Sequence, residues 1–397
     1  MGKLFIEDLD VKGKKVLVRV DFNVPISNGV ITSDNRITAS LPTINYLSEK
    51  GAKVILMSHL GRPKGEKKLE FTLKPVAEYL KTKVSANVTF ADDCIGDSVA
   101  AAVQTLQNGD ILVLENLRFY KQEEKNDPEF ARQLASFGEI YVNDAFGTAH
   151  RAHASTEGVT HYIKQCAAGY LMKKELDYLG MVVSNPKHPF VAVMGGAKVS
   201  DKIEVITNLL AKVDTLIIGG GMVYTFYKAQ GKEVGKSLLE ADKVEVAEKI
   251  LEEAAAQGKK LLLPIDDVVA AEFNNDSPSK VVENGEIPAD MMGLDIGPKS
   301  IALFSSELEN AKTVVWNGPM GVFEMENFSK GTFAIAQALA KATENGAITI
   351  IGGGDSASAI KKAGLAKKVS HVSTGGGASL EFLEGKILPG VAALTDK

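Results

Sequence analysis

The sequence has little cysteine, no long apolar run and no excess of basic charge. Its two cysteines, Cys94 and Cys166, do not form a C-x-x-C pair, which argues against a disulfide framework or a thiolate metal site and indicates a reducing compartment. No stretch approaches the ~18 apolar residues of a membrane span, and the start is charged, without an apolar leader. With a net charge of −5, the chain also lacks the basic surface of a nucleic-acid binder. We therefore expect a cytoplasmic protein that binds neither membranes nor nucleic acids.

Arginine is also scarce, and it is unevenly placed. Six of the 45 basic residues are arginines, whereas the other 39 are lysines spread along the chain. The guanidinium group is a planar, always charged fork of donors that fits phosphate or carboxylate in a way that an ammonium group cannot. The arginines therefore mark an anion site, or else they reflect a lysine-preferring composition with surface ion pairs. All lie within the first 151 residues: Arg19, Arg36, Arg62, Arg118, Arg132 and Arg151.

The length and the hydrophobic pattern predict two α/β domains. A chain of 397 residues is long for a single hydrophobic core. Short β-branched runs alternate with amphipathic stretches, which is typical of parallel sheets flanked by helices. The fold class is therefore α/β, with two similar doubly wound parallel-sheet (Rossmann-like) domains joined by a helical hinge. Strands are expected at 15–20, 53–58, 87–90, 110–115 and 139–143, and again at 190–195, 215–219, 260–266, 313–316 and 347–352.

A helix-like segment at about 170–183 separates the two sets of strands. The SNPKHP sequence at 184–189 follows it, and its two prolines and asparagine are typical of a boundary. We place the domain junction there.

Arginines and histidines follow the strands of the first half. Parallel strands bring their carboxyl ends to one edge, where open α/β sheets bind ligands. Four arginines can therefore converge with His59, His150 and His153 into an anion pocket, the alternative being helix capping or surface ion pairs. Arg19 lies inside a strand and is interpreted as structural, and Arg132 lies in a helix outside the pocket. The converging arginines are Arg36, Arg62, Arg118 and Arg151.

The second half has four strand–glycine–helix turns, at 191–203, 215–226, 348–360 and 372–383. Glycine lets a backbone approach a ligand, and the amides at a helix start favour phosphate, although a single such turn can be only a packing device. Lys198 and Lys202 are four residues apart, so a helix would place both on one face, toward a phosphate. Asp355 at a helix start suits either a cap or a phosphate-bound Mg²⁺.

Familiar nucleotide and zinc motifs are missing. GKEVGKS at 231–237 has the wrong spacing for a P-loop, no G-x-G-x-x-G opens an early helix, and no Cys/His cluster indicates zinc.

Eight segments resemble the signature segments of the phosphoglycerate kinase family from end to end of the chain. They are RVDFNVP (19–25), SHLGRP (58–63), LENLRF (114–119), NDAFGTAHRAHAST (143–156), GGAKVSDKI (195–203), WNGPMGVFE (316–324), GGGDS (352–356) and STGGGASLE (373–381). The resemblance implies a monomeric glycolytic and gluconeogenic kinase. It would interconvert 1,3-bisphosphoglycerate plus ADP with 3-phosphoglycerate plus ATP, with Mg²⁺ as cofactor.

The same resemblance assigns roles to residues. The glycerate substrate would be bound by Asp21, Phe22, Asn23, Arg36, His59, Leu60, Gly61, Arg62, Arg118 and Arg151. The nucleotide would be bound by Gly196, Ala197, Lys202, Gly293, Asn317, Glu324, Gly353, Gly354, Asp355 and Ser356, with Glu324 at the ribose and Asp355 at Mg²⁺. Ser356 stands where the family often has threonine, and it keeps the hydroxyl. The catalytic residues would be Arg36, Lys198, Gly375 and Gly376.

The resemblance also implies how the chain is divided. The tail at about 384–397 would return to the first domain. This gives a 3-phosphoglycerate domain (1–170 plus the tail), a hinge helix (171–183) and a nucleotide domain (184–383). The two domains would close over the junction and exclude water. Two other functions fit the same residues less well: a non-catalytic sensor of phosphorylated ligands, and a kinase acting on acetate or carbamate, which would not need a second anion pocket.

Overall fold

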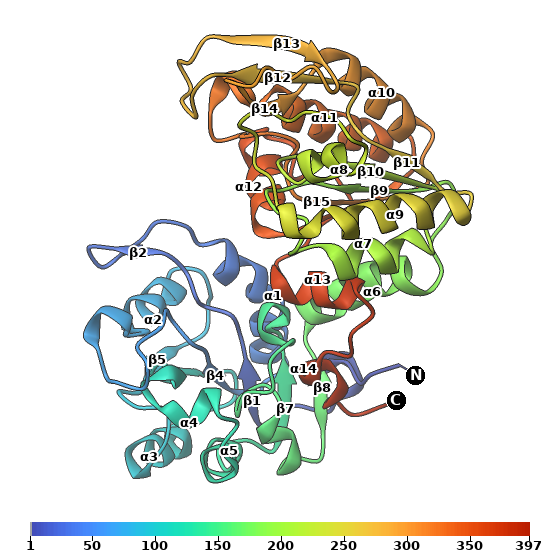
Figure 1. Ribbon diagram of the computed structural model, residues 1–397. Helices are drawn as coiled ribbons and strands as arrows, with labels where there is room; N and C mark the ends of the chain where they lie inside the picture. The colour runs from blue at the N-terminus through green and yellow to red at the C-terminus, as the bar shows by residue number, and fades with distance from the viewer. Residues whose placement is uncertain (1) are drawn as a thin grey trace. The chain divides into compact units, whose positions relative to one another are not determined.

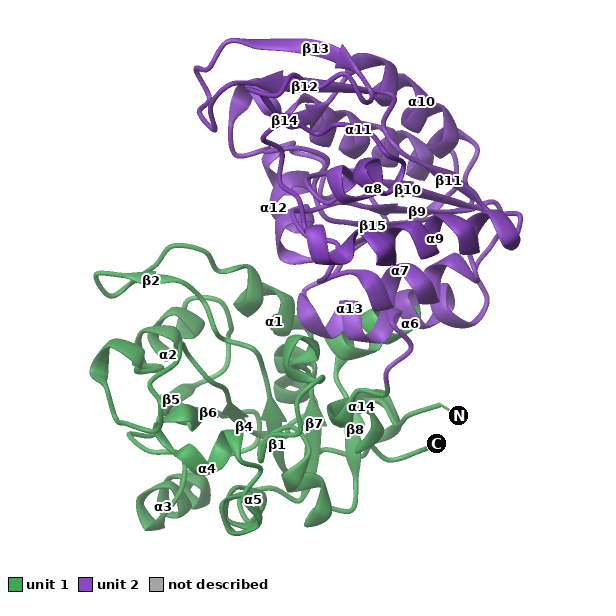
Figure 2. Ribbon diagram, viewed as in Figure 1, with its two compact units in different colours: residues 1–177, 387–397 green, residues 178–386 purple. Residues whose placement is uncertain are grey.

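The computed structural model describes residues 2–397 and divides the chain into two compact units. Unit 1 comprises Met1–Asp177 and Ile387–Lys397, and unit 2 comprises Tyr178–Lys386 (Figure 2). The helix α6, Tyr170–Ser184, begins in unit 1 and ends in unit 2.

Unit 1 is a parallel six-stranded sheet in the order β5-β6-β4-β1-β7-β8. Helices cover both of its faces (Figure 1). The strands are β1 (Lys15–Arg19), β4 (Lys53–Met57), β5 (Val88–Phe90), β6 (Ile111–Val113), β7 (Ile140–Asn143) and β8 (Cys166–Ala168). The helices are α1 (Asn35–Glu49), α2 (Lys74–Lys81), α3 (Asp97–Thr105), α4 (Lys121–Glu124), α5 (Pro128–Ala135) and α14 (Pro389–Ala392), and a small hairpin joins β2 (Ile26–Ser27) to β3 (Val30–Ile31).

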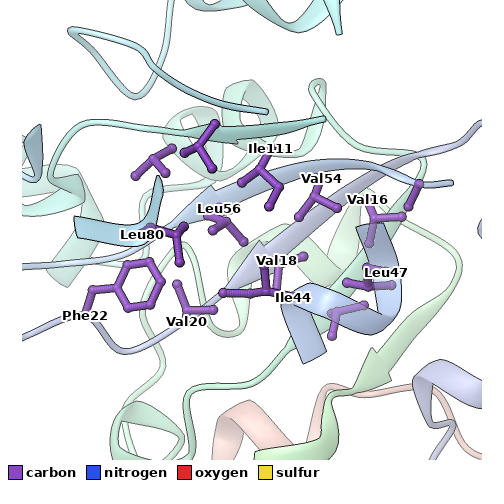
Figure 3. Close-up of a cluster of buried hydrophobic side chains, with 14 of the residues drawn as sticks. Val16, Val18, Val20, Phe22, Ile44, Leu47, Val54, Leu56, Leu80 and Ile111 are labelled. Atoms are coloured by element: carbon purple, nitrogen blue, oxygen red, sulfur yellow. The ribbon is translucent and has the colours of Figure 1, made fainter. Parts of the chain in front are cut away.

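The core of unit 1 forms because alternate residues of each strand point to the same face. Val16 and Val18 of β1 are fully buried beside Ile44 and Leu47 of α1 (Figure 3). Burying each such aliphatic side chain contributes about 1.5–3 kcal/mol. Because β1 pairs with β4 on one side and with β7 on the other, it lies inside the sheet, and the loop that follows it lies near the centre of the sheet edge.

A buried carboxylate caps the start of α6. Asp144 follows β7 directly, and its Oδ1 accepts hydrogen bonds from the backbone N–H groups of Leu171 (2.9 Å) and Met172 (3.2 Å). The neighbouring N–H of Tyr170 donates to the hydroxyl of Thr43 at 2.9 Å. Burial raises the pKa of Asp144 to about 7. The first N–H groups of α6 have no partner inside the helix, and they are satisfied by Asp144, which follows β7, and by Thr43 of α1.

Unit 2 contains a second parallel six-stranded sheet, in the order β11-β10-β9-β15-β16-β17. Its strands are β9 (Phe190–Met194), β10 (Thr215–Ile218), β11 (Lys260–Leu262), β15 (Thr313–Asn317), β16 (Ile348–Gly352) and β17 (His371–Val372). Its helices are α7 (Ile203–Leu210), α8 (Val223–Ala229), α9 (Val244–Ala256), α10 (Pro298–Glu309), α11 (Lys330–Glu344), α12 (Gly354–Lys362) and α13 (Gly377–Leu383).

One predicted strand is wrong. Residues 260–266 do not form a single strand, because β11 ends at Leu262 and Pro264, which has no N–H to donate, interrupts the run. Asp266 instead begins β12 (Asp266–Ala270) of a separate antiparallel sheet that the sequence analysis did not predict. In this sheet β12 lies between β13 (Ser279–Glu283) and β14 (Met292–Ile296). The remainder of unit 2 has the predicted α/β pattern.

Candidate active site

The carboxyl ends of four neighbouring strands carry the polar segments of unit 1. The strands β6, β4, β1 and β7 are adjacent in the sheet, so the loops that follow them share one edge. These loops carry Arg118, His59, Asp21 and His153, all of them buried. We call this region the arginine edge.

The side chains of two asparagines form hydrogen bonds that connect these loops. Asn116 accepts hydrogen bonds from the N–H groups of Leu60 (3.2 Å) and Arg118 (3.0 Å), and its Nδ2 donates to the carbonyl of Leu60 at 2.7 Å. Asn23 accepts from the N–H of Gly61 at 2.9 Å, and the Arg118 guanidinium donates to the carbonyl of Gly61 at 2.9 Å. Loops from β1, β4 and β6 are therefore held in one fixed arrangement.

Gly61 has to be glycine in this arrangement. Its φ is +61°, which favours glycine, and a Cβ there would lie 2.4 Å from the ring of Phe71. The next residue, Arg62, is exposed. Its backbone position is thus fixed while its side chain faces solvent.

Arg36, in the first turn of α1, is paired with Asp21. Its Nη1 lies 2.9 Å from both carboxylate oxygens of Asp21, and Asp21 also accepts from the N–H of Asn23 at 3.1 Å. Arg36 is partly exposed whereas Asp21 is buried. The carboxylate therefore orients the guanidinium from one side and leaves its other donors for a ligand.

Arg19, the last residue of β1, contacts residues of the arginine edge from within the protein core. It is fully buried, and it donates to the hydroxyl of Ser155 at 2.7 Å and lies 3.1 Å from Nδ1 of His59. The buried Glu123 accepts from the Ser155 hydroxyl at 2.5 Å and from its N–H at 3.0 Å. Burial raises the pKa of Glu123. The structural role expected for Arg19 agrees with these contacts.

The arginine edge carries concentrated positive charge. Burial, followed by the nearby charges of Arg19 and Arg118, holds the pKa of His59 well below its usual value and lowers that of His153 to about 4. Arg151 also acts on His153, and its Nε lies 3.2 Å from His150. Both His59 and His153 are neutral at physiological pH, because burial disfavours the charged ring and because a proton there would also meet the charges of the nearby arginines. Such a cluster is a site for an anion with more than one negative charge.

In unit 2 the turns after the strands enclose two adjoining cavities. One, of about 300 Å³, is lined by polar groups, and we call it the polar cavity. The other, of about 360 Å³, is lined mainly by apolar groups, and we call it the apolar cavity. Gly196, Ala197 and Asp355 line both, so the two cavities are continuous.

The turns around the polar cavity interlock through their backbones. The N–H of Gly196 donates to the carbonyl of Pro319 at 2.9 Å, and the N–H of Gly318 donates to the hydroxyl of Ser356 at 2.6 Å. A Cβ on Gly195 would lie 2.2 Å from the carbonyl oxygen of Pro319. Gly353, with a φ of +85°, precedes α12, and Gly354 and Asp355 form its exposed first turn. These glycines allow the close approach of backbone segments.

Two polar side chains line the polar cavity from different turns. Nζ of Lys202 donates to Oδ1 of Asn317, while Nδ2 of Asn317 is buried with no partner among the described residues. Burial lowers the pKa of Lys202. An unsatisfied buried donor beside a buried ammonium group favours a ligand with acceptor oxygens.

The prediction that Lys198 and Lys202 share a helix face is wrong. The helix α7 begins only at Ile203, and both lysines lie in the turn before it. Lys198 is exposed whereas Lys202 is largely buried, although both line the polar cavity. Gly376 lines this cavity too, but the buried Gly375 gives its N–H to the Ser373 hydroxyl at 3.1 Å.

The apolar cavity contains the predicted Gly293 and Glu324. A Cβ on Gly293 would lie 1.8 Å from the Tyr224 hydroxyl oxygen, so this position is closed to any side chain. Sequence reasoning missed most of the apolar lining, because single apolar residues in loops carry no periodic signal. The missed residues include Tyr224, Leu238, Phe273, Met292, Met320 and Val322.

The residues of unit 2 fit a magnesium ion carried by phosphates, not a resident metal. No group of three or more His, Cys, Asp or Glu side chains arranged to hold a metal exists among residues 2–397. Asp355 is exposed and lines both cavities. Mg²⁺ commonly takes one or two carboxylates together with substrate phosphates and water, which matches a single carboxylate in this position.

Comparison with known proteins gives the family. A sequence model described as phosphoglycerate kinase matches residues 6–386. The chain is 59% identical to phosphoglycerate kinase from Chloroherpeton thalassium over 396 residues, covering all of both chains. It is 61% identical to the cytosolic phosphoglycerate kinase of Triticum aestivum over 390 residues, covering 98% of this chain and 97% of the other.

Solved structures agree. The structure of phosphoglycerate kinase from Coxiella burnetii has a TM-score of 0.90 at 44% identity, and that from Pyrococcus horikoshii has 0.83 at 33%, each covering 98% of both chains.

The chain belongs to the phosphoglycerate kinase family. The resemblance read from the signature segments is therefore confirmed, as is the α/β fold class. The activity inferred with it is also confirmed: this is a phosphotransferase that interconverts 1,3-bisphosphoglycerate and ADP with 3-phosphoglycerate and ATP. Among residues 2–397, no helix combines the length and the apolar character needed to cross a bilayer.

Proposed function

We propose that the arginine edge binds the glycerate substrate and that the two cavities of unit 2 bind the nucleotide. The observation that carries the proposal is the gathering of Arg118, the Arg36–Asp21 pair and the buried His59 and His153 at one sheet edge, where burial and then the arginine charges hold both histidines neutral. Three phosphate oxygens and a carboxylate need several forked donors, and Arg36, Arg62, Arg118 and Arg151 supply them. Asp21, Phe22, Asn23, Leu60 and Gly61 would shape the pocket.

The nucleotide would divide between the cavities by polarity. Its base and ribose would occupy the apolar cavity. Gly293, which has no side chain, would line the space for them, and Glu324 would accept hydrogen bonds from the ribose. Its phosphates would occupy the polar cavity, where Lys202, Asn317 and Ser356 and the amides of Gly353 and Gly354 surround them. Free N–H groups at the start of α12 favour this negative charge.

The proposed chemistry needs no general base. The acceptor oxygen of 3-phosphoglycerate is a carboxylate that is already ionised at neutral pH. Phosphoryl transfer then depends on positioning and on stabilising the charge that spreads over three equatorial oxygens. In unit 2, Lys198 and the Gly376 N–H would stabilise that charge, and Gly375 would fix the turn that presents Gly376. In unit 1, Arg36 is the catalytic candidate.

Asp355 would hold the Mg²⁺ that the nucleotide brings. When bound, the ion neutralises phosphate charge that the protein otherwise meets with one buried lysine and backbone amides. The single exposed carboxylate at the junction of the two cavities supports this role. We further infer a monomeric, cytoplasmic protein with no nucleic-acid partner, in keeping with its acidic net charge.

A coupled assay tests the proposed substrate site. ATP-dependent turnover is expected with 3-phosphoglycerate and not with acetate or carbamate, because those acceptors carry no second anion for the arginine edge. Arg118→Lys should raise the KM for 3-phosphoglycerate at least tenfold and leave the KM for ATP within about twofold, since a lysine cannot replace a forked donor. Equal turnover with acetate, or an unchanged KM in the variant, would contradict the proposal.

A further inference from the structure

The β12–β13 loop, residues 271–278, contributes Phe273 to the lining of the apolar cavity. Phe273 lines this cavity and is nevertheless 62% exposed. An exposed aromatic ring at a cavity mouth can bury further surface only when a ligand covers it. Its contribution to binding therefore depends on what holds the loop in place.

The loop is internally bonded but has few links to the rest of the protein. Ser277 and Asn274 bond within it: the N–H of Glu272 donates to the Ser277 hydroxyl at 3.3 Å, and the N–H of Asp276 donates to Asn274 Oδ1 at 3.1 Å. The loop keeps its own shape through these bonds. They do not fix its position over the cavity.

Two hydrogen bonds between Asn275 and Asn327 fix the position of the loop. The N–H of Asn327 donates to Oδ1 of Asn275 at 3.1 Å, and Nδ2 of Asn327 donates to the carbonyl of Asn275 at 2.7 Å. Within the described chain, these are the hydrogen bonds that join loop residues 271–278 to another segment. Asn327 thus holds the loop through one side chain and one backbone group.

The segment on the other side of this pair is firmly anchored. Phe328, next to Asn327, is fully buried against Ala270 and Leu294. The N–H of Val322 donates to the carbonyl of Leu294 at 2.8 Å. Glu324, which lines the apolar cavity, lies between these two anchors. The amide pair therefore connects a fixed wall bearing Glu324 to a loop bearing Phe273.

We propose that Asn275 and Asn327 are positioning residues that set the nucleoside affinity of the apolar cavity by holding Phe273 over its mouth. This rests on the proposed function of that cavity as the nucleoside site. Neither asparagine lines the cavity, so each acts through the loop. Losing the pair lets the loop move, and the nucleotide must then order the loop when it binds.

The test compares ADP with tripolyphosphate, which has the phosphates but no nucleoside. Asn275→Ala and Asn327→Ala should each weaken ADP binding about three- to tenfold, because each loses one hydrogen bond of the pair. The double variant should be weaker than either single one, because each single substitution leaves the one hydrogen bond that the other removes. Competition by tripolyphosphate, the KM for 3-phosphoglycerate and kcat at saturating ATP should not change. Asn327→Asp, which turns the donor into an acceptor facing the Asn275 carbonyl, should lose at least as much as Asn327→Ala.

Asn310→Ala is the matched control, since Asn310 is an exposed asparagine at the end of α10 and should leave every constant unchanged. Unchanged ADP affinity in both single variants would overturn the inference. Equal weakening of ADP and tripolyphosphate together with a lower kcat would also overturn it, by showing a merely structural role. If the wild-type protein binds no ADP, or if ADP and tripolyphosphate do not compete, the proposed function itself fails.

Discussion

Single residues in this protein differ in role according to what surrounds them, even when their type is the same. Arg19 is fully buried and bonded to Ser155 and His59, whereas Arg62 and Arg151 are exposed at the arginine edge. Arg132 forms an exposed pair with Glu129 three residues earlier, which contributes little to stability. The bias of arginine toward the first 151 residues thus combines one scaffold residue, one surface pair and four ligand candidates.

At the residue scale, substitution of Lys198 should affect catalysis without affecting nucleotide binding. It is exposed at the rim of the polar cavity, whereas Lys202 is largely buried within it. Lys198→Ala should lower kcat at least ~100-fold, since a preorganised charge acts mainly in the transition state, and should change the Kd for ADP by less than about threefold. Steady-state kinetics and calorimetric titration measure the two effects. Lys361→Ala, at an exposed lysine in the last turn of α12, should change neither, and retained turnover in Lys198→Ala would refute the assigned role.

His153 makes the stability of unit 1 depend on pH. Burial and the surrounding arginines lower its pKa to about 4, whereas in the unfolded chain it binds a proton at about pH 6.5. Between these values the unfolded state binds more protons, so stability is complete above about pH 6.5 and is lost as the pH falls toward 4. His153→Gln should make this decline shallower by up to about 1.4 kcal/mol per pH unit. The free energy of unfolding of the wild type and of His153→Gln, measured in urea at pH 7, 6 and 5, tests this difference.

The exposed His161 provides the comparison for this experiment. It pairs with Glu157 at the surface, where the exchange His161→Gln should leave the decline nearly as steep as in the wild type. A His153→Gln protein that loses stability with acid as steeply as the wild type would show that His153 does not carry the effect.

At the scale of elements, the start of α6 depends on the residue that directly follows strand β7. Asp144 accepts two amides of this helix, and its folded pKa of about 7 lies above the ordinary value of 3.8. The stability linked to its protonation is present below about pH 4 and is lost as the pH rises through about 7. Asp144→Asn keeps an acceptor oxygen and does not ionise, so its stability relative to the wild type should rise between pH 5 and pH 7. Asp144→Ala should be about 1–2 kcal/mol less stable than Asp144→Asn at either pH, because the amides lose their partner.

Denaturant unfolding of the two variants and the wild type separates these contributions. A difference between Asp144→Asn and the wild type that does not change with pH would contradict the titration of Asp144. Equal stability of the Asn and Ala variants would show that the cap contributes nothing to α6.

The elements also show where pattern-based prediction works. Strands with short, nearly continuous apolar runs, such as β1 and β9, appear where expected because both faces of a parallel sheet are buried. The run at 260–266 misled because Pro264 breaks it and its two ends belong to different sheets. The short β8 and β17 were missed because β8 (Cys166–Ala168) contains no β-branched residue and β17 (His371–Val372) is only two residues long.

At the scale of the whole molecule, two units of the same fold class carry different chemistry. Unit 1 offers arginine side chains at its strand ends, while unit 2 offers glycine-turn amides, two lysines and two exposed carboxylates, Asp201 and Asp355. The second group of donors has no need of arginine, because helix-start amides and a metal ion borne by the substrate suit phosphates already. The proposed division of substrates between the units accounts for the uneven distribution of arginine.

The sequence by itself determined the family, the α/β class and the motifs that carry the charged groups, because these depend on residue type, spacing and strand periodicity. Only the tertiary structure decided which group faces which. In the structure, Lys198 and Lys202 lie in a turn instead of on a helix, and Arg19 lies against His59. Phe273 and Glu324 line one cavity, and Asn275 and Asn327 link the segments that carry them. The physical reason is that burial, pKa and contact between distant segments arise from packing, which no local pattern of residues encodes.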